Sequence, residues 1–142
     1  MKQLFKGKKY ASYYQFYLED KASTQSAEEI CNDANFEKLL GVGNQMLVIN
    51  TNRYDYVKVS LTLFAQAPKV NLATSERINE CSLLITSILK LGSEISSDWT
   101  EYEIEPNIYR VRILYKNLGT AKEQFRIQLW EENEMRETLY LK

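Results

Sequence analysis

The residues best suited to chemistry lie between Gly92 and Ile108, where the chain reads GSEISSDWTEYEIEPNI. The five acids of this stretch are Glu94, Asp98, Glu101, Glu103 and Glu105, and it contains no Lys or Arg. Paired carboxylates can act as general acid and base or bind a hard metal ion. Both tasks need a defined separation or an oxygen-rich shell, and the spacing here matches no calcium loop. Acids interleaved with Trp99 and Tyr102 are typical instead of an interface for a basic partner.

We therefore predict a partner-binding surface in this acidic and aromatic segment. Its residues are Asp98, Trp99, Glu101, Tyr102, Glu103 and Glu105. The simpler interpretation is a solvated loop and an outward strand face, because the glutamates alternate with less polar residues. A second acidic cluster follows Trp130 and extends to Glu137. If the two clusters adjoin in the fold, they form one anionic surface.

Several kinds of chemistry are missing from the 142 residues. Histidine is absent, which excludes Ser-His-Asp and Cys-His catalysis and histidine metal sites. Gly41-Val42-Gly43 lacks the third glycine or the Lys-Ser/Thr pair of a phosphate-binding loop. Cys31 and Cys81 are far apart without CxxC spacing, so we predict two free thiols. We expect no catalytic residue, no metal and no cofactor.

The charge distribution argues against nucleic acid as a partner. Residues 1–9 carry four lysines and no acid, and we interpret them as a frayed, solvated terminus. The rest of the chain has 14 bases and 19 acids, a net charge of −5. Arg110, Arg112 and Arg126 are predicted to point outward and could form a basic stripe with tyrosines. Cross-strand ion pairs explain these arginines better in a chain with a pI near 5.6.

Clean alternation of apolar and polar residues predicts the strands that would hold these side chains. Tyr54–Phe64 and Asn107–Lys116 each have one apolar face, which indicates half-buried strands. Gln45–Thr51 contains four consecutive apolar residues and is predicted to be buried on both faces. Residues 125–130 alternate again after turn residues at 117–120, so the two strands should form a hairpin.

The remaining segments are predicted to be short. We expect a strand at Tyr10–Leu18 covered on both sides, a helix over 27–40 capped by Ser26, and a last strand at 136–141. Residues 80–85 and 88–91 are predicted to form a hairpin, with one long helix over 76–91 as the alternative. The count is seven or eight strands with at most one short helix. This predicts a mainly β fold, an antiparallel β-sandwich in which residues 1–142 form a single domain, with a barrel as the alternative closure.

Three stretches resemble the competence protein J family of small bacterial all-β proteins. They are Tyr13–Asp20 (YYQFYLED), Asn107–Arg112 (NIYRVR) and Phe125–Trp130 (FRIQLW), which agree with the family in order and spacing over most of the chain. Competence protein J inhibits a nuclease of DNA uptake, and its relatives resemble immunity proteins against nuclease toxins. The chain departs from the family at Met46–Asn52, where a glycine-rich strand and turn are expected. The resemblance transfers no contact residues.

The resemblance and the acidic segment together lead us to expect a cytoplasmic immunity protein, of the kind that acts in contact-dependent growth inhibition, and not an enzyme. Its partner would be a protein toxin, a nuclease domain with a basic cleft, blocked by occlusion of the active site. We expect neither direct nucleic acid nor a membrane as a partner. Two alternatives stay open. A carboxylate-dependent enzyme would hold an acid such as Asp98 in a pocket with a raised pKa, and a carbohydrate-binding sandwich would display a coplanar row of aromatic rings.

Overall fold

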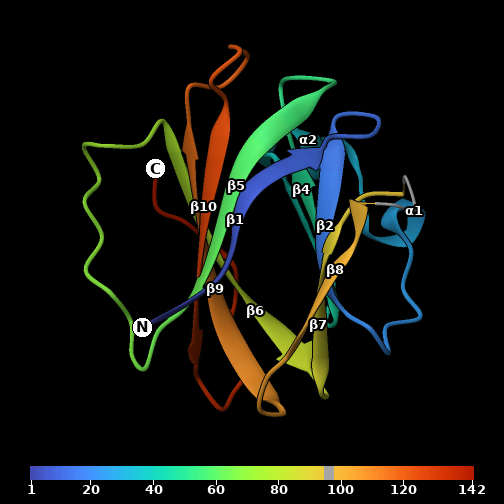
Figure 1. Cartoon of the computed structure of the whole chain (residues 1–142), viewed down its shortest axis with the longest axis vertical. Helices are drawn as coiled ribbons and strands as arrows, with labels where there is room; N and C mark the ends of the chain where they lie inside the picture. The colour runs from blue at the N-terminus through green and yellow to red at the C-terminus, as the bar shows by residue number, and fades with distance from the viewer. Residues whose placement is uncertain (95–97) are drawn as a thin grey trace.

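The computed structural model describes residues 1–94 and 98–142 and shows two β-sheets packed face to face (Figure 1). The six-stranded sheet has the order β1 (Lys2–Tyr10), β5 (Tyr56–Leu63), β10 (Gln124–Glu131), β9 (Asn107–Lys116), β6 (Arg77–Ile85) and β11 (Leu139–Tyr140). The five-stranded sheet has the order β3 (Leu40–Val42), β4 (Met46–Asn50), β2 (Gln15–Asp20), β7 (Ile88–Gly92) and β8 (Thr100–Glu103). Two helices, α1 (Ala27–Ile30) and α2 (Asp33–Lys38), connect β2 to β3.

The core lies between the two sheets and is filled by the inward side chains of both. The predicted inward face of β9 is confirmed, because Tyr109, Val111, Ile113 and Tyr115 are all buried. Phe125 on β10 joins the two sheets: its ring centroid is 5.3 Å from that of Phe16 on β2 and 5.2 Å from that of Tyr115. Edge-on aromatic pairs of this kind contribute about 0.5–1.5 kcal/mol beyond their buried area.

The mainly β sandwich predicted from the sequence is confirmed, with differences in detail. The described residues form eleven strands rather than seven or eight, and the pairs are antiparallel except for β5 and β10, which are parallel. The expected helix over 27–40 is split in two. Asn32 caps α2, because its side chain accepts a hydrogen bond from the Asn35 backbone N–H. As an N-cap it has an extended backbone, so α1 cannot continue through it into α2. Neither helix among the described residues is long and apolar enough to cross a membrane.

The N-terminal segment differs most from expectation. Residues 1–9 are not frayed, because β1 pairs with β5 from Lys2 to Tyr10. Lysines suit an edge strand because their charge discourages pairing with a further strand. The single strand predicted at Tyr10–Leu18 is also wrong. Tyr13 and Tyr14 adopt left-handed backbone conformations, with φ of 52° and 62°, and turn the chain from β1 into the other sheet.

The predicted hairpin of residues 80–91 is wrong, although both of its strands form. β6 pairs with β9 and β11 in one sheet, whereas β7 pairs with β2 and β8 in the other. The chain crosses between the sheets at Thr86. Buried Asp20 holds this corner by accepting hydrogen bonds from the Thr86 backbone N–H at 3.1 Å and from its hydroxyl at 2.9 Å.

Arg110 and Arg112 point away from the core as predicted, but they are buried rather than solvated. The loop between β5 and β6 and the C-terminal segment run over this side of the six-stranded sheet (Figure 1). Each Nε donates to one carboxylate oxygen of Glu80 at 3.1 Å. Arg112 also donates to Gln128, while the Arg110 guanidinium donates to the backbone carbonyl of Glu137. The predicted cross-strand ion pairs are therefore present for Arg110 and Arg112, with Glu80 as the shared partner, whereas Arg126 is exposed and forms no ion pair among the described residues.

Candidate partner-binding surface

The acidic and aromatic segment forms β8 and the residues on either side of it. β8 is an edge strand of the five-stranded sheet, and its register places Glu101 beside Lys90 and Glu103 beside Ile88 of β7. Glu101 and Glu103 are exposed, and the intervening Tyr102 is half-buried. The strand thus presents its carboxylates to solvent along a sheet edge that carries unpaired backbone groups.

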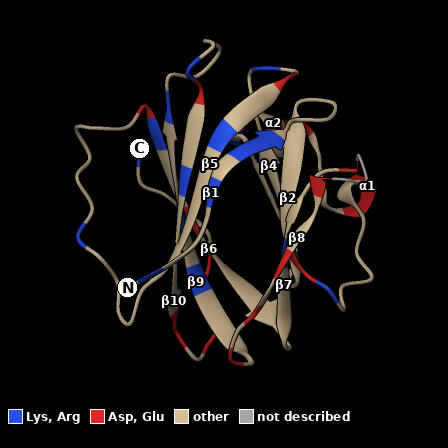
Figure 2. Ribbon diagram, viewed as in Figure 1, with Lys and Arg blue, Asp and Glu red and all other residues tan. Residues whose placement is uncertain are grey.

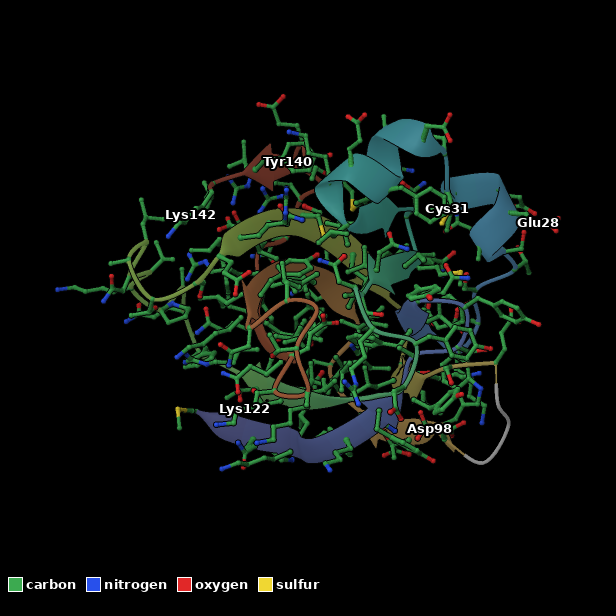
Figure 3. The ribbon with its side chains drawn as sticks, turned by 90° about the horizontal axis from the view of Figure 1, so that it is seen from above. Glu28, Cys31, Asp98, Lys122, Tyr140 and Lys142 are labelled. Carbon is green, nitrogen blue, oxygen red and sulfur yellow. The ribbon has the colours of Figure 1, made fainter. Side chains whose placement is uncertain are left out.

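Asp98 connects the two sheets. Its carboxylate accepts a hydrogen bond from the Tyr10 backbone N–H at 2.8 Å, and Figure 3 shows it beside the end of β1. Lys9 donates from Nζ to the Asp98 backbone carbonyl and to the Thr100 hydroxyl. Burial lowers the pKa of Lys9, while the charge of Asp98 acts in the opposite direction. The structure therefore engages Asp98 in holding an edge of the sandwich together.

Trp99 is half-buried against the outer side of the five-stranded sheet. Its ring stacks on that of Tyr17 with centroids 6.1 Å apart, and the Lys90 ammonium lies 4.1 Å from its centroid. A glycine at position 92 permits this approach, because a Cβ there would lie 2.9 Å from a Trp99 ring atom. Trp99 packs against the small outer cluster that also contains Ile30 of α1.

Tyr102 packs against the main core, and its hydroxyl donates to Thr100 Oγ1 at 2.8 Å. Burial raises the pKa of Tyr102, and this hydrogen bond partly offsets the effect. Both aromatic residues predicted as anchors for a partner thus also attach the segment to its own protein. Each remains partly exposed, so a partner could still contact it.

The exposed carboxylates of β8 and of the connection that follows it are Glu101, Glu103 and Glu105. Glu101 pairs with Lys21 at 3.1 Å, but both side chains are about half exposed, and such pairs contribute at most about 1 kcal/mol. Among the described residues, Glu103 and Glu105 have no ion-pair partner. Their charge is therefore available to an incoming cationic surface.

The two acidic clusters adjoin at one end of the sandwich. Asn107 donates from Nδ2 to Asn133 Oδ1 at 2.8 Å, which ties the start of β9 to the turn after β10. Burial raises the pKa of Tyr109 to about 12, with further contributions from the charges of Glu131 and Glu105. Figure 2 shows acidic residues in both connections at this end. We call Glu103, Glu105, Glu131 and Glu134 the anionic end.

The geometry bears on the two alternative functions, a carbohydrate-binding sandwich and a carboxylate-dependent enzyme. The exposed tyrosines do not form a coplanar row, since the four pairs among Tyr10, Tyr13, Tyr14, Tyr54 and Tyr56 meet at 76° to 89°. The carboxylates at 101, 103 and 105 are exposed on an edge rather than held in a pocket. The described residues contain no group of three or more His, Cys, Asp or Glu that could hold a metal ion. Both thiols are free, with Cys81 in the core and Cys31 half-buried.

The sequence left open whether Glu131 and Glu134 adjoin the acidic segment, and the structure places them at the same end of the sandwich. The predicted hairpin already indicated this proximity, because it places the end of β10, which Glu131 occupies, beside the start of β9. The sequence pattern also placed Tyr13 and Tyr14 in a covered strand, whereas both side chains are exposed. Nothing in the spacing of YASYYQFYL marks a left-handed turn at two tyrosines.

The fold defines a class of small two-sheet sandwiches to which solved structures of two other proteins also conform. ComJ from Bacillus subtilis, an inhibitor of the DNA-degrading activity of NucA, shares the fold with a TM-score of 0.73 at 15% identity, over 92% of this chain and 98% of ComJ. The product of crocagin biosynthetic gene J matches with a TM-score of 0.63 at 16% identity, over 92% of this chain and 96% of its own. No protein-family model and no curated protein matches the sequence. The resemblance to competence protein J is thus confirmed at the level of the fold.

Proposed function

We propose that this protein is an immunity protein that binds a nuclease and blocks its active site by occlusion, without turnover. The observation that carries the proposal is an anionic end of exposed carboxylates on a fold shared with ComJ, a nuclease inhibitor. In this role the protein acts in the cytoplasm, where an incoming nuclease toxin would meet nucleic acid. The proposed partner is a nuclease domain with a basic cleft.

The physical basis is charge complementarity. A nuclease must attract polyanionic substrate, so its cleft is basic, and carboxylates held on a rigid sheet can occupy the positions of phosphates. The anionic end is rigidly attached: the Tyr109 hydroxyl donates to the Glu105 carbonyl at 2.6 Å, and Asn107 and Asn133 join the start of β9 to the turn after β10. A surface ordered before binding loses less conformational entropy when the complex forms.

The test uses each nuclease domain encoded beside this gene, with NucA as a reference enzyme. Cleavage of labelled DNA and labelled RNA is measured with increasing amounts of the protein. We expect stoichiometric inhibition of one of the encoded nucleases. The double variant Glu105→Lys and Glu131→Lys should inhibit roughly tenfold or more weakly, because it reverses two charges facing the cleft.

The matched control is Glu28→Lys, which reverses an exposed carboxylate on α1, an element that Figure 1 shows apart from the connections at the anionic end. It should inhibit as the unmodified protein does. Full nuclease activity in every mixture would refute the proposed function. Equal loss in the control and the double variant would show that net charge, not this surface, is responsible.

A further inference from the structure

Five tyrosines gather where β1 ends and β5 begins, and we call them the tyrosine cluster. They are Tyr10, Tyr13, Tyr14, Tyr54 and Tyr56, whose ring centroids lie 5.1 to 6.0 Å apart in four edge-on pairs. Tyr13 is 69% exposed, Tyr56 53% and Tyr14 51%. So many large rings in contact with each other and with water form a patch of the kind that marks an interaction site.

The backbone that presents two of these rings is unfavourable for them. Tyr13 and Tyr14 both have positive φ, a conformation in which Cβ crowds the following carbonyl oxygen and which glycine adopts without penalty. The turn is held by the Gln15 backbone N–H, which donates to the Ser12 carbonyl, and by the Thr51 N–H, which donates to the Tyr14 carbonyl. Two consecutive tyrosines in the left-handed region carry a backbone penalty while their rings stay largely exposed, so their presence favours a role in binding.

A row of cations continues from the tyrosine cluster on the same face. In the register of β1 and β5, Tyr10 faces Tyr56, Lys8 faces Lys58 and Lys6 faces Ser60. Residues two apart on a strand share a face, so these side chains form one ladder. β10 adds Arg126 beside Ser60. We call Lys6, Lys8, Lys58 and Arg126 the basic face, and Figure 2 shows its Lys residues along β1 and β5.

The basic face is concave and free of carboxylates in its lining. A depression of about 660 Å³ lies over β1, β5 and β10 and is lined by Gln3, Lys6, Gly7, Lys8, Lys58, Val59, Ser60, Gln124, Phe125 and Arg126. The acid at its margin, Asp55, is paired with Arg53 at 2.9 Å. The cations of the basic face have no ion-pair partner among the described residues. Their charge is therefore not neutralised by a direct ion pair. The nearest effect of an acid on them is at Lys8, because the pKa of Asp55 is lowered first by the hydrogen bond from the Tyr56 backbone N–H and further by the charge of Lys8.

We propose that the tyrosine cluster and the basic face together bind single-stranded nucleic acid. Unpaired bases stack on exposed aromatic rings, and a row of Lys and Arg follows the phosphates. A duplex hides the faces of its bases, and an acidic protein segment offers no flat partner for the exposed rings. The net charge of −1 does not oppose this binding, because the lining of the basic face holds four cations and no carboxylate, so the local field there is positive.

The test measures fluorescence anisotropy of labelled oligothymidylate and oligouridylate with the full chain at low and at physiological ionic strength. We expect saturable binding that weakens as salt rises, because lysines displace counterions from phosphates. The double variant Lys8→Glu and Lys58→Glu should bind roughly tenfold or more weakly. The control Glu105→Lys with Glu131→Lys should bind at least as tightly as the unmodified protein, and it separates this proposal from nuclease inhibition.

Tyr13→Gly separates a binding role from a structural one. Glycine relieves the positive φ, so we expect the melting temperature to stay equal or rise by about 3 °C. Loss of the ring should nevertheless weaken oligonucleotide binding roughly tenfold. Absence of saturable binding at low salt would overturn the proposal. So would unchanged binding by Tyr13→Gly, or equal affinity for duplex DNA or polyglutamate, which would indicate a surface that binds any polyanion.

Discussion

At the scale of single residues, Glu80 has the largest expected effect on stability. Its carboxylate is the shared partner of two buried guanidinium groups. A neutral side chain at this position would therefore leave both positive charges without an ion-pair partner. We expect Glu80→Gln to lower the free energy of unfolding by about 3–5 kcal/mol, measured by urea denaturation. Glu37→Gln on exposed α2 should change it by less than about 0.5 kcal/mol. Similar stabilities for the two variants would contradict this account.

Tyr109 makes stability depend on alkaline pH. Its pKa is raised to about 12 in the folded protein, from an unfolded value of about 10. The folded state therefore holds a proton that the unfolded state releases, so the stabilisation is fully present below about pH 10 and is lost as pH rises towards about 12. Urea unfolding at about pH 8 and about pH 11 should show a smaller loss for Tyr109→Phe than for the unmodified protein. Equal losses would show that Tyr109 does not titrate in this window.

The residues also show where pattern analysis stops. Alternation correctly assigned Tyr109 to the core and Arg110 to the opposite face of β9. It could not show that the C-terminal segment covers Arg110, because this contact joins residues far apart in the sequence. Burial of an outward arginine depends on tertiary covering, which no local spacing encodes.

At the scale of elements, β1 depends on the segment that precedes β8. Asp98→Ala removes the acceptor of the Tyr10 backbone N–H and leaves that donor unpaired. We expect a loss of about 1–3 kcal/mol in the free energy of unfolding and faster amide hydrogen exchange along β1. β9 should keep its protection, and it serves as the internal reference. Unchanged exchange in β1 would show that pairing with β5 is sufficient to hold it.

This position of Asp98 changes how the predicted surface is tested. A charge reversal at Asp98 would disturb the sandwich edge as well as the surface, whereas Glu103 and Glu105 are exposed and can be changed separately. Of the six predicted residues, the three glutamates are exposed, and Asp98, Trp99 and Tyr102 are engaged in holding the segment. The sequence was sufficient to identify this segment as acidic. Only the fold shows which of its residues hold the segment in place and which are exposed to solvent.

Strands whose apolar and polar residues alternate strictly were predictable from the sequence. Strands whose position depends on the neighbouring strand were not. β5, β9 and β10 follow from alternation, and β4 follows from its apolar run. β1 is rich in lysine and became a strand because β5 offers an open edge. β6 and β7 have the composition of strands, but their assignment to different sheets depends on the corner at Thr86 and Asp20.

At the scale of the whole molecule, a net charge of −1 conceals two surfaces of opposite sign. The anionic end carries Glu103, Glu105, Glu131 and Glu134, and the basic face lies on β1, β5 and β10. The sequence indicated both charge clusters. Their separation follows from topology, because the β8–β9 and β10–β11 connections meet at one end, while the lysines lie along an outer sheet face.

This separation predicts opposite effects of one double variant on the two proposed interactions. Lys8→Glu with Lys58→Glu adds negative charge to a surface that a basic nuclease would not contact. The changed overall field should raise the association rate constant with the inhibited nuclease by a few fold at low salt, about 2–5-fold, while weakening oligonucleotide binding. Stopped-flow mixing at two ionic strengths measures the first effect, and anisotropy measures the second. The gain in association rate should vanish at high salt, because screening beyond about 10 Å removes a long-range field. A slower association at low salt would mean that Lys8 and Lys58 attract an acidic surface of the nuclease, and it would contradict both assignments.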